Sequence, residues 1–97
     1  MTGVTFSPLA RQDLGRLWNY TAQHWGPDQA DRYIRQIAAA CTALAAGRKQ
    51  GHSAEAIRPG YSKYPVGSHI LYYRRGEHAR IEVIRILHRR MDVERHL

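Results

Sequence analysis

Few side chains of this 97-residue sequence have types and spacings suited to metal or nucleophilic chemistry. The six histidines, at positions 24, 52, 69, 78, 88 and 96, never recur three or four residues apart, the spacing that builds a metal site on one helix face. We therefore expect neither a metal ion nor another cofactor. The single cysteine, Cys41, lies in an apolar stripe, which predicts a buried, inert thiol.

Arginine provides the best candidates for a binding surface. The chain has 15 Lys and Arg against 8 Asp and Glu, a formal net charge of +7 and a pI of about 10.2. Such charge favours an acidic partner, namely nucleic acid, an acidic protein segment or a membrane surface. A solvated face is the usual explanation of such charge, although guanidinium groups suit phosphate and carboxylate recognition. The arginines expected at the ends of the sheet are Arg58, Arg74, Arg75, Arg89 and Arg90.

The composition also predicts a compartment. No apolar run approaches the roughly 20 residues that a membrane span requires, so we expect no membrane partner. Residues 1–4 lack the basic start and apolar region of a signal peptide. One cysteine fits a reducing environment. We expect one cytoplasmic domain over residues 1–97.

Three runs of β-branched and aromatic residues predict the strands that position the arginines. They cover residues 61–66, 69–75 and 79–87, and the loop at residues 76–78 makes the last two an antiparallel hairpin. Pro65 cannot donate to a ladder, which restricts the first run to a sheet edge or a bulge. Residues 4–6 add a short N-terminal strand. The helical pattern is lost from residue 47 to residue 60, and the polar, Gly-rich residues 48–53 are expected to form a mobile loop before residues 57–60 lead into the sheet.

The first half of the chain predicts a helical hairpin. Ser7 and Pro8 are suited to start a helix, and Gly26 and Pro27 separate it from a second helix that ends at Gly47. So short a turn requires the helices to lie antiparallel. The fold class is therefore α+β: a small antiparallel sheet, with one short N-terminal and three C-terminal strands, backed by two helices.

Aromatic residues and one arginine have two interpretations each. Trp18 and Trp25 lie at helical spacing beside leucines, which favours the core over base stacking. Strand alternation places Arg85 on one face with Ile81, Val83, Leu87 and Arg89. It must therefore either open to a groove or form an ion pair, for which Glu82 and Glu77 are candidates. Two interpretations are equally open for the tyrosines of the strands: they form a stacking surface, or one side of each strand is packed and the other is half-exposed. These tyrosines are Tyr61, Tyr64, Tyr72 and Tyr73.

Three segments together resemble the RelE/ParE toxin superfamily, and specifically its ParE branch. They are residues 7–14, residues 58–74 and residues 83–97, so the resemblance covers essentially the whole chain. The most specific part is Leu87-His88-Arg89-Arg90-Met91-Asp92.

The resemblance implies a toxin of a type II toxin–antitoxin pair that binds and inhibits DNA gyrase without being an enzyme. Its expected partner is a ParD-like ribbon-helix-helix antitoxin, in a toxin–antitoxin heterotetramer, with no sequence-specific DNA binding by the toxin alone. The antitoxin is expected along the helical hairpin and the adjoining strand edge, with candidates Trp18, Trp25, Tyr33, Tyr72 and Arg74. The expected toxic surface is Arg58, Arg74, Arg85, His88, Arg89, Arg90, Met91 and Asp92.

The same superfamily includes ribosome-dependent mRNA endonucleases, and these are the alternative. Glu55 and His88 lie near positions where some of those nucleases keep a catalytic carboxylate and a histidine. Against cleavage, the strand at residues 69–75 lacks the expected arginine before Tyr72, and no tyrosine follows Tyr73. An inactive module that only binds an antitoxin is the third possibility.

Overall fold

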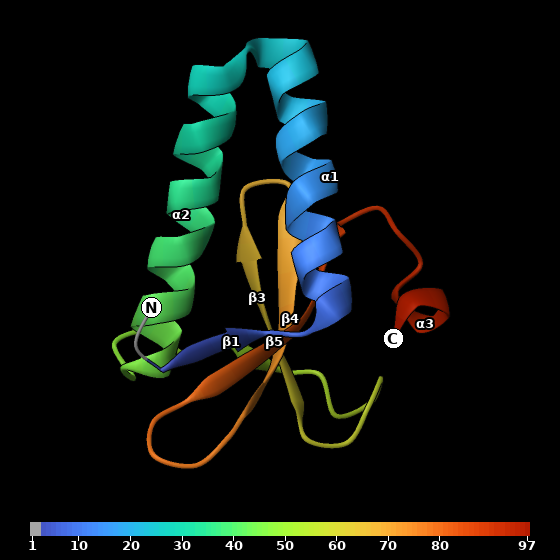
Figure 1. Cartoon of the computed structure of the whole chain (residues 1–97). Helices are drawn as coiled ribbons and strands as arrows, with labels where there is room; N and C mark the ends of the chain where they lie inside the picture. The colour runs from blue at the N-terminus through green and yellow to red at the C-terminus, as the bar shows by residue number, and fades with distance from the viewer. Residues whose placement is uncertain (1–2) are drawn as a thin grey trace.

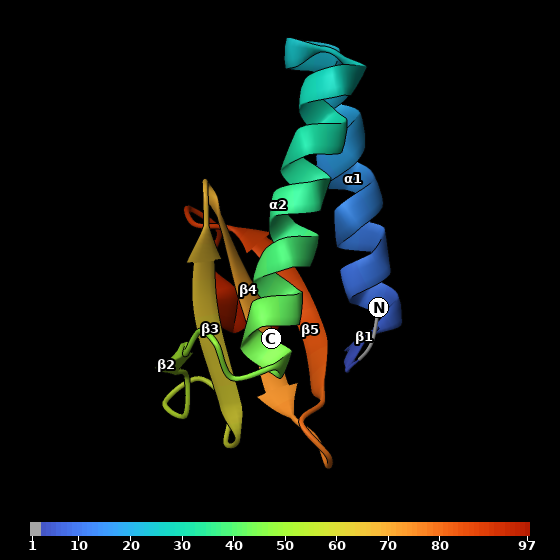
Figure 2. The same ribbon diagram turned by 90° about the vertical axis from the view of Figure 1, so that its left-hand side faces the viewer.

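The computed structural model describes residues 3–97, in which two long helices pack on one face of a five-stranded sheet (Figures 1 and 2). The strands are ordered β1-β5-β4-β3-β2 across the sheet. The elements along the chain are β1 (Val4–Phe6), α1 (Pro8–Trp25), α2 (Pro27–Ala45), β2 (His52–Ser53), β3 (Tyr61–Val66), β4 (His69–Arg75), β5 (Ile81–His88) and α3 (Val93–His96). None of the helices in the described part could cross a membrane.

The predicted α+β architecture and its four strands are confirmed, with two additions. β2 lies within the segment that we predicted as a mobile loop, and it pairs with β3 through His52 and Ser53. Two exposed residues are too few to show a period of two, so no pattern could have revealed this strand. β1 runs parallel to β5, so the sheet is mixed although largely antiparallel.

Pro65, which has no backbone N–H to donate, lies in a part of β3 that does not pair with β2. It lies in β3, opposite Ile70 of β4. β2 pairs with β3 only at Lys63 and Ser62, so Pro65 lies beyond the end of β2. The missing N–H of Pro65 therefore interrupts no ladder on that side.

Local sequence sets the ends of both long helices. Ser7 caps α1, since its Oγ accepts a hydrogen bond from Ala10 N at 3.0 Å. Gly26, at φ 92°, ends α1 and precedes α2, and Pro27 occupies the first turn of α2. At the other end of α2, Arg75 donates to Leu44 O at 2.9 Å and so ties the helix to the end of β4.

The core lies between the helical hairpin and the sheet. Cys41 is fully buried in it, as predicted, and burial raises the pKa of its thiol to about 11, which keeps the thiol protonated and unreactive. The largest fully buried side chains of the core are Tyr73, Ile37, Leu44, Leu71, Ile81 and Val83.

The prediction that both tryptophans belong to the core was wrong. Trp25 is 66% exposed at the end of α1. Trp18 is half-buried, and its indole N–H donates to Asp31 of α2 at 2.9 Å. Trp25 is the last residue of α1, at the tip of the hairpin, and this tip extends past the sheet (Figure 2).

A β-bulge changes which residues of β5 face the helices. Tyr72 pairs with Arg85 while Tyr73 pairs with Val83, so Ile84 is an extra residue in β5. The predicted alternation, which grouped Leu87 with Ile81 and Val83, therefore fails after the bulge. The core cluster contains Ile81 and Val83 but continues with Ile86.

Candidate functional site

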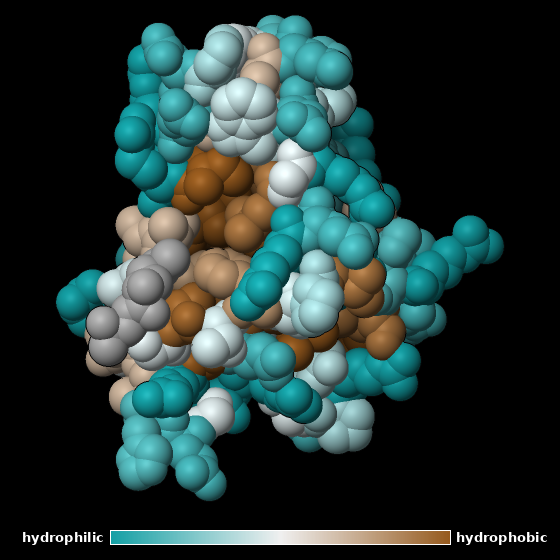
Figure 3. All heavy atoms as spheres, viewed as in Figure 1, coloured by the Kyte–Doolittle hydropathy of each residue, from teal (hydrophilic) through white to brown (hydrophobic). Residues whose placement is uncertain are grey.

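Two adjoining cavities lie between the helical hairpin and the sheet, with volumes of about 360 and 450 Å³. Tyr20, Thr21, His69 and His88 line both of them. Figure 3 shows hydrophobic surface in the middle of one face, surrounded by hydrophilic side chains. The smaller cavity is also lined by Trp25, Gln29, Tyr33, Gln36, Gly67 and Ser68, and the larger by Asp13, Arg16, Leu17, Arg85, Ile86, Met91 and His96.

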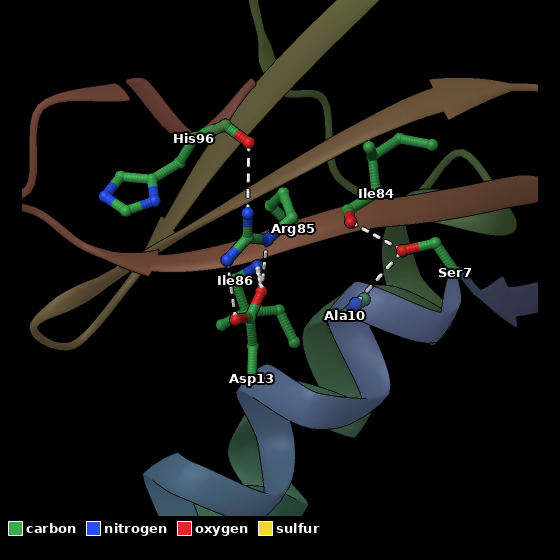
Figure 4. Close-up of polar contacts among 7 residues, drawn as sticks. All are labelled: Ser7, Ala10, Asp13, Ile84, Arg85, Ile86 and His96. Carbon is green, nitrogen blue, oxygen red and sulfur yellow. Dashed lines mark hydrogen bonds and ion pairs between the residues drawn. The ribbon is translucent and has the colours of Figure 1, made fainter. Parts of the chain in front are cut away.

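Arg85 is held in the wall of the larger cavity by Asp13 of α1 (Figure 4). Its Nε and one terminal nitrogen donate to the two Asp13 carboxylate oxygens at 2.8 and 3.0 Å. This hydrogen bonding raises the pKa of Arg85 and outweighs the opposing effect of burial. The ion pair that we predicted with Glu82 or Glu77 was therefore wrong. Arg85 is only 8% exposed and presents no free guanidinium to a partner.

The N-terminal half of α1 also completes the hydrogen bonds of the bulge (Figure 4). Ser7 Oγ donates to Ile84 O at 2.6 Å, and Asp13 accepts from Ile86 N at 2.9 Å. These side chains pair backbone groups of β5 that lie beyond Val83, the last residue of β5 that pairs with β1. Asp13 was missed as a site residue, although its spacing from Ala10 and Leu17 placed a carboxylate on the buried face of the helix.

The end of β5 and the turn after it bring part of the predicted toxic surface together. His88 and Met91 line the larger cavity, and Met91 is 50% exposed. Asp92 caps α3 by accepting from Glu94 N at 3.2 Å. Arg89 and Arg90 are exposed, and within residues 3–97 neither forms an ion pair.

Two other arginines of that predicted surface lie elsewhere. Arg74 forms an ion pair with Glu82, with a nitrogen–oxygen distance of 2.7 Å. It lies five residues along β4 from His69, which is roughly 16 Å along the strand. Arg58 Nε donates to Leu97 O at 2.6 Å, while Arg85 donates to His96 O at 3.0 Å. Together Arg58 and Arg85 hold the C-terminal residues around α3 against the sheet.

The structure does not place Glu55 with His88. The Glu55 carboxylate accepts from Gly60 N and closes the loop before β3. Glu55 lines neither cavity, whereas His88 lines both. In the described part of the chain, no three His, Cys, Asp or Glu side chains are grouped to hold a metal ion.

The candidate antitoxin contacts differ in how accessible they are. Tyr72 is buried at 4% exposure, so its side chain offers little to a partner. Tyr33 is half-buried, and burial raises the pKa of its phenol. Trp25 lines the smaller cavity and remains largely exposed, next to the stacked rings of Tyr20 and His24 at 4.0 Å. Tyr20 and His69 are lining residues that sequence patterns did not single out.

A family model and two curated relatives describe proteins similar to this chain. A family model described as the ParE toxin of the type II toxin–antitoxin system parDE matches residues 4–93. Toxin ParE1 of Mycobacterium tuberculosis is 44% identical over 91 residues, which are 94% of this chain and 93% of the relative. Toxin ParE1 of Caulobacter vibrioides is 39% identical over 97 residues, covering 100% and 99%.

A solved structure agrees with the fold. A chain of the chromosomal ParDE toxin–antitoxin system from P. aeruginosa superposes with a TM-score of 0.72 at 20% identity, covering 91% of this chain and 96% of that one. The family model and both relatives extend over nearly the whole sequence, including the helical hairpin and the cavities beneath it. This chain therefore belongs to the ParE toxin family of type II toxin–antitoxin systems.

Proposed function

We propose that this toxin acts in the cytoplasm by binding DNA gyrase, without cleaving mRNA, and that a ParD-like ribbon-helix-helix antitoxin neutralises it. The observation that supports the non-enzymatic part is the separation of Glu55 and His88, the two side chains expected to act in cleavage. Glu55 closes its own loop and lines neither cavity, whereas His88 lines both. The carboxylate expected as a general base therefore does not lie beside His88.

The charge of the molecule supports an acidic target surface. The chain carries a formal charge of +7, and Arg89 and Arg90 lie exposed beside the exposed Met91. Unpaired guanidinium groups can donate to phosphate oxygens or carboxylates without first breaking an ion pair. We assign the gyrase-binding surface to residues 88–92, next to the larger cavity.

The test is to add the purified chain to a gyrase supercoiling reaction and, in parallel, to ribosomes programmed with mRNA. We expect supercoiling to be lost or cleaved DNA to accumulate, while the mRNA stays intact. Cut mRNA with gyrase unaffected would move the protein to the nuclease branch. No effect in either reaction would leave an inactive module that only binds an antitoxin.

Substitutions at two residues distinguish binding from cleavage more directly. Glu55→Ala should leave gyrase inhibition within about twofold of the wild type, since it removes one exposed hydrogen bond of about 1 kcal/mol. A nuclease that used Glu55 as its general base would instead lose about 10²–10⁴-fold in rate. His88→Ala is the companion substitution, because a nuclease should be sensitive to both.

The antitoxin is proposed to cover the helical hairpin and the adjoining strand edge, with Trp25, Trp18, Tyr33 and Arg74 as contacts. Trp25 and Arg74 are exposed, and Trp18 and Tyr33 are half-buried. Light scattering of the purified toxin–antitoxin complex should give the mass of two toxins and two antitoxins. Trp25→Ala should weaken that complex, and unchanged affinity would remove the hairpin tip from the interface.

A further inference from the structure

A pair of histidines forms the wall that the two cavities share. His69 begins β4 and His88 ends β5, and the two residues are directly paired across the strands. Their ring centroids are 5.4 Å apart, with the planes at 80°. In the described residues Nδ1 of each ring has a hydrogen-bond partner and Nε2 has none. No buried side-chain nitrogen in this part of the chain lacks a partner, so Nε2 of each ring is accessible, in residues that line both cavities.

The hydroxyl of Tyr33 fixes the position of the proton on His69. Tyr33 Oη lies 2.9 Å from Val66 O, 3.1 Å from Ser68 N and 2.7 Å from His69 Nδ1. Val66 O can only accept, so we assign the hydroxyl proton to that contact. On this assignment the contact with His69, whose roles depend on the tautomer, uses a proton on the ring. His69 therefore carries its proton on Nδ1, and its Nε2 is an acceptor.

His88 has the opposite arrangement. Its Nδ1 accepts a hydrogen bond from the backbone N–H of Arg90 at 3.2 Å. An Nδ1 that accepts carries no proton, so neutral His88 carries its proton on Nε2 and presents a donor. The two rings therefore differ in kind: His69 offers an acceptor, and His88 offers a donor.

We infer that His69 and His88 form a recognition site for a carboxamide, the side chain of an Asn or Gln of a partner protein. The NH₂ of the amide donates to His69 Nε2, and its carbonyl accepts from His88 Nε2–H. With hydrogen bonds of about 2.9 Å to each ring, one planar amide can reach both rings. A carboxylate can satisfy only His88, and an ammonium group only His69, so the pair selects a neutral group that both donates and accepts.

The surroundings of the pair favour a protein over a nucleic acid. No Arg, Lys, Asp or Glu lines the smaller cavity, whereas Asp13, Arg16 and Arg85 line the larger one, where Arg85 pairs with Asp13. An amide brings no charge and fits the smaller cavity, whereas the phosphate of a nucleotide would need a cation and find it only on the side of Arg16. Tyr20 and Trp25 supply apolar surface for the neighbouring side chains of a protein segment. That the partner is a protein rests on the proposed function, whereas the proton positions do not.

The protonation of His69 supports its role as an acceptor. Burial, and next the nearby His88, lower the pKa of His69 to about 4, against a smaller opposing effect of Asp13. The ring thus stays neutral at physiological pH and keeps its free lone pair.

Nitrogen-15 NMR of the imidazole rings of the full chain at neutral pH tests the proton positions. We expect the protonated nitrogen to be Nδ1 in His69 and Nε2 in His88. Finding Nε2 protonated in both rings would leave two donors and overturn the assignment. Tyr33→Phe should release His69 to the usual tautomer mixture, whereas Tyr20→Phe, which removes a cavity hydroxyl that bonds to neither ring, should not.

Titration of the same sample with small probes tests the ligand class. Propanamide should shift the signals of both rings in a saturable way, and propanoate and propylammonium should not shift both. Equal or larger effects of propanoate would remove the selectivity, and no effect of propanamide would remove the site. Stronger binding of adenosine than of propanamide would make the ligand a nucleobase and overturn the proposal. Because gyrase is absent from these samples, a negative result leaves the proposed function untouched.

Discussion

Asp13 and Arg85 show how one buried pair can determine what an arginine does. Arg85 is 8% and Asp13 7% exposed, and the carboxylate binds both the guanidinium and the backbone of Ile86. The sequence alone required Arg85 to have a partner, because a buried unpaired charge is costly. It could not identify Asp13, since the two residues are 72 positions apart and local charges compete for the assignment.

Removing the carboxylate should destabilise the protein strongly. Asp13→Ala leaves the guanidinium buried and unpaired, so we expect a loss of about 3–5 kcal/mol in the free energy of unfolding. Arg74→Ala, which breaks the exposed pair with Glu82, should cost less than about 1 kcal/mol. Urea denaturation of both variants compares the two costs. Equal costs would mean that the burial of the Asp13–Arg85 pair does not make it more important for stability than the exposed Arg74–Glu82 pair.

His69 should make stability depend on pH in the acidic range. The folded ring has a pKa of about 4, whereas the unfolded ring titrates near about 6.5. Between these values the unfolded state binds more protons, so the free energy of unfolding should fall as the pH drops from about 6.5 towards 4. His69→Gln should flatten this part of the profile. An unchanged slope in His69→Gln would contradict the burial of that ring.

Among the elements, the β3–β4 turn must leave room for a side chain of α2. Gly67 has φ +55°, and a Cβ there would lie 2.8 Å from Tyr33 Oη. Gly60 also has a positive φ, +82°, but a Cβ there would meet nothing within 4 Å. A residue with a Cβ would therefore be strained at either position, but only at position 67 would it also collide with Tyr33.

This difference predicts unequal effects of alanine. Gly60→Ala should cost about 1–2 kcal/mol, the penalty of a left-handed conformation for a residue with a Cβ. Gly67→Ala should cost more, by about 1–3 kcal/mol for the crowding, and should displace the Tyr33 hydroxyl from His69. Thermal unfolding measures the two costs, and the His69 ring signal reports the displacement. Equal costs would show that Tyr33 moves away freely.

Most elements could be predicted because their signals are local. Ser7 with Pro8 and Gly26 with Pro27 mark helix ends within a few residues. The apolar stripes between them predict the helical hairpin, which the structure confirms. The bulge at Ile84 has no local signal, because the ladder and α1 together accommodate the extra residue. Because the extra residue Ile84 was not predicted, the alternation after it was assigned to the wrong faces. Ile86 lies in the core cluster, and Leu87 lies outside it. The cavities were missed for the same reason, since α1, α2, β4 and β5, which are far apart in the sequence, all contribute to their walls.

For the whole molecule, the location of charge should matter more than its amount. Arg89→Glu with Arg90→Glu lowers the net charge by four, and so does Arg32→Glu with Arg35→Glu on the exposed face of α2. We expect the first pair to weaken gyrase inhibition at least tenfold, because like charges oppose docking at the contact itself. The second pair should change it by less than about threefold, through weaker long-range attraction. Similar losses in both would mean that only total charge acts.

The parallel pairing of β1 with β5 has a consequence for synthesis on the ribosome. Val4 pairs with Ile81, and Ser7 and Asp13 bond to residues 84–86, so the first elements to be made wait for the last strand. Contacts separated by more than 70 residues cannot form in a nascent chain that lacks the later partner. The cavities and the ordered turn at residues 88–92 therefore arise only after β5 has left the exit tunnel. We expect the nascent toxin to stay harmless to its own cell until then. An antitoxin that has already folded therefore has time to bind the toxin.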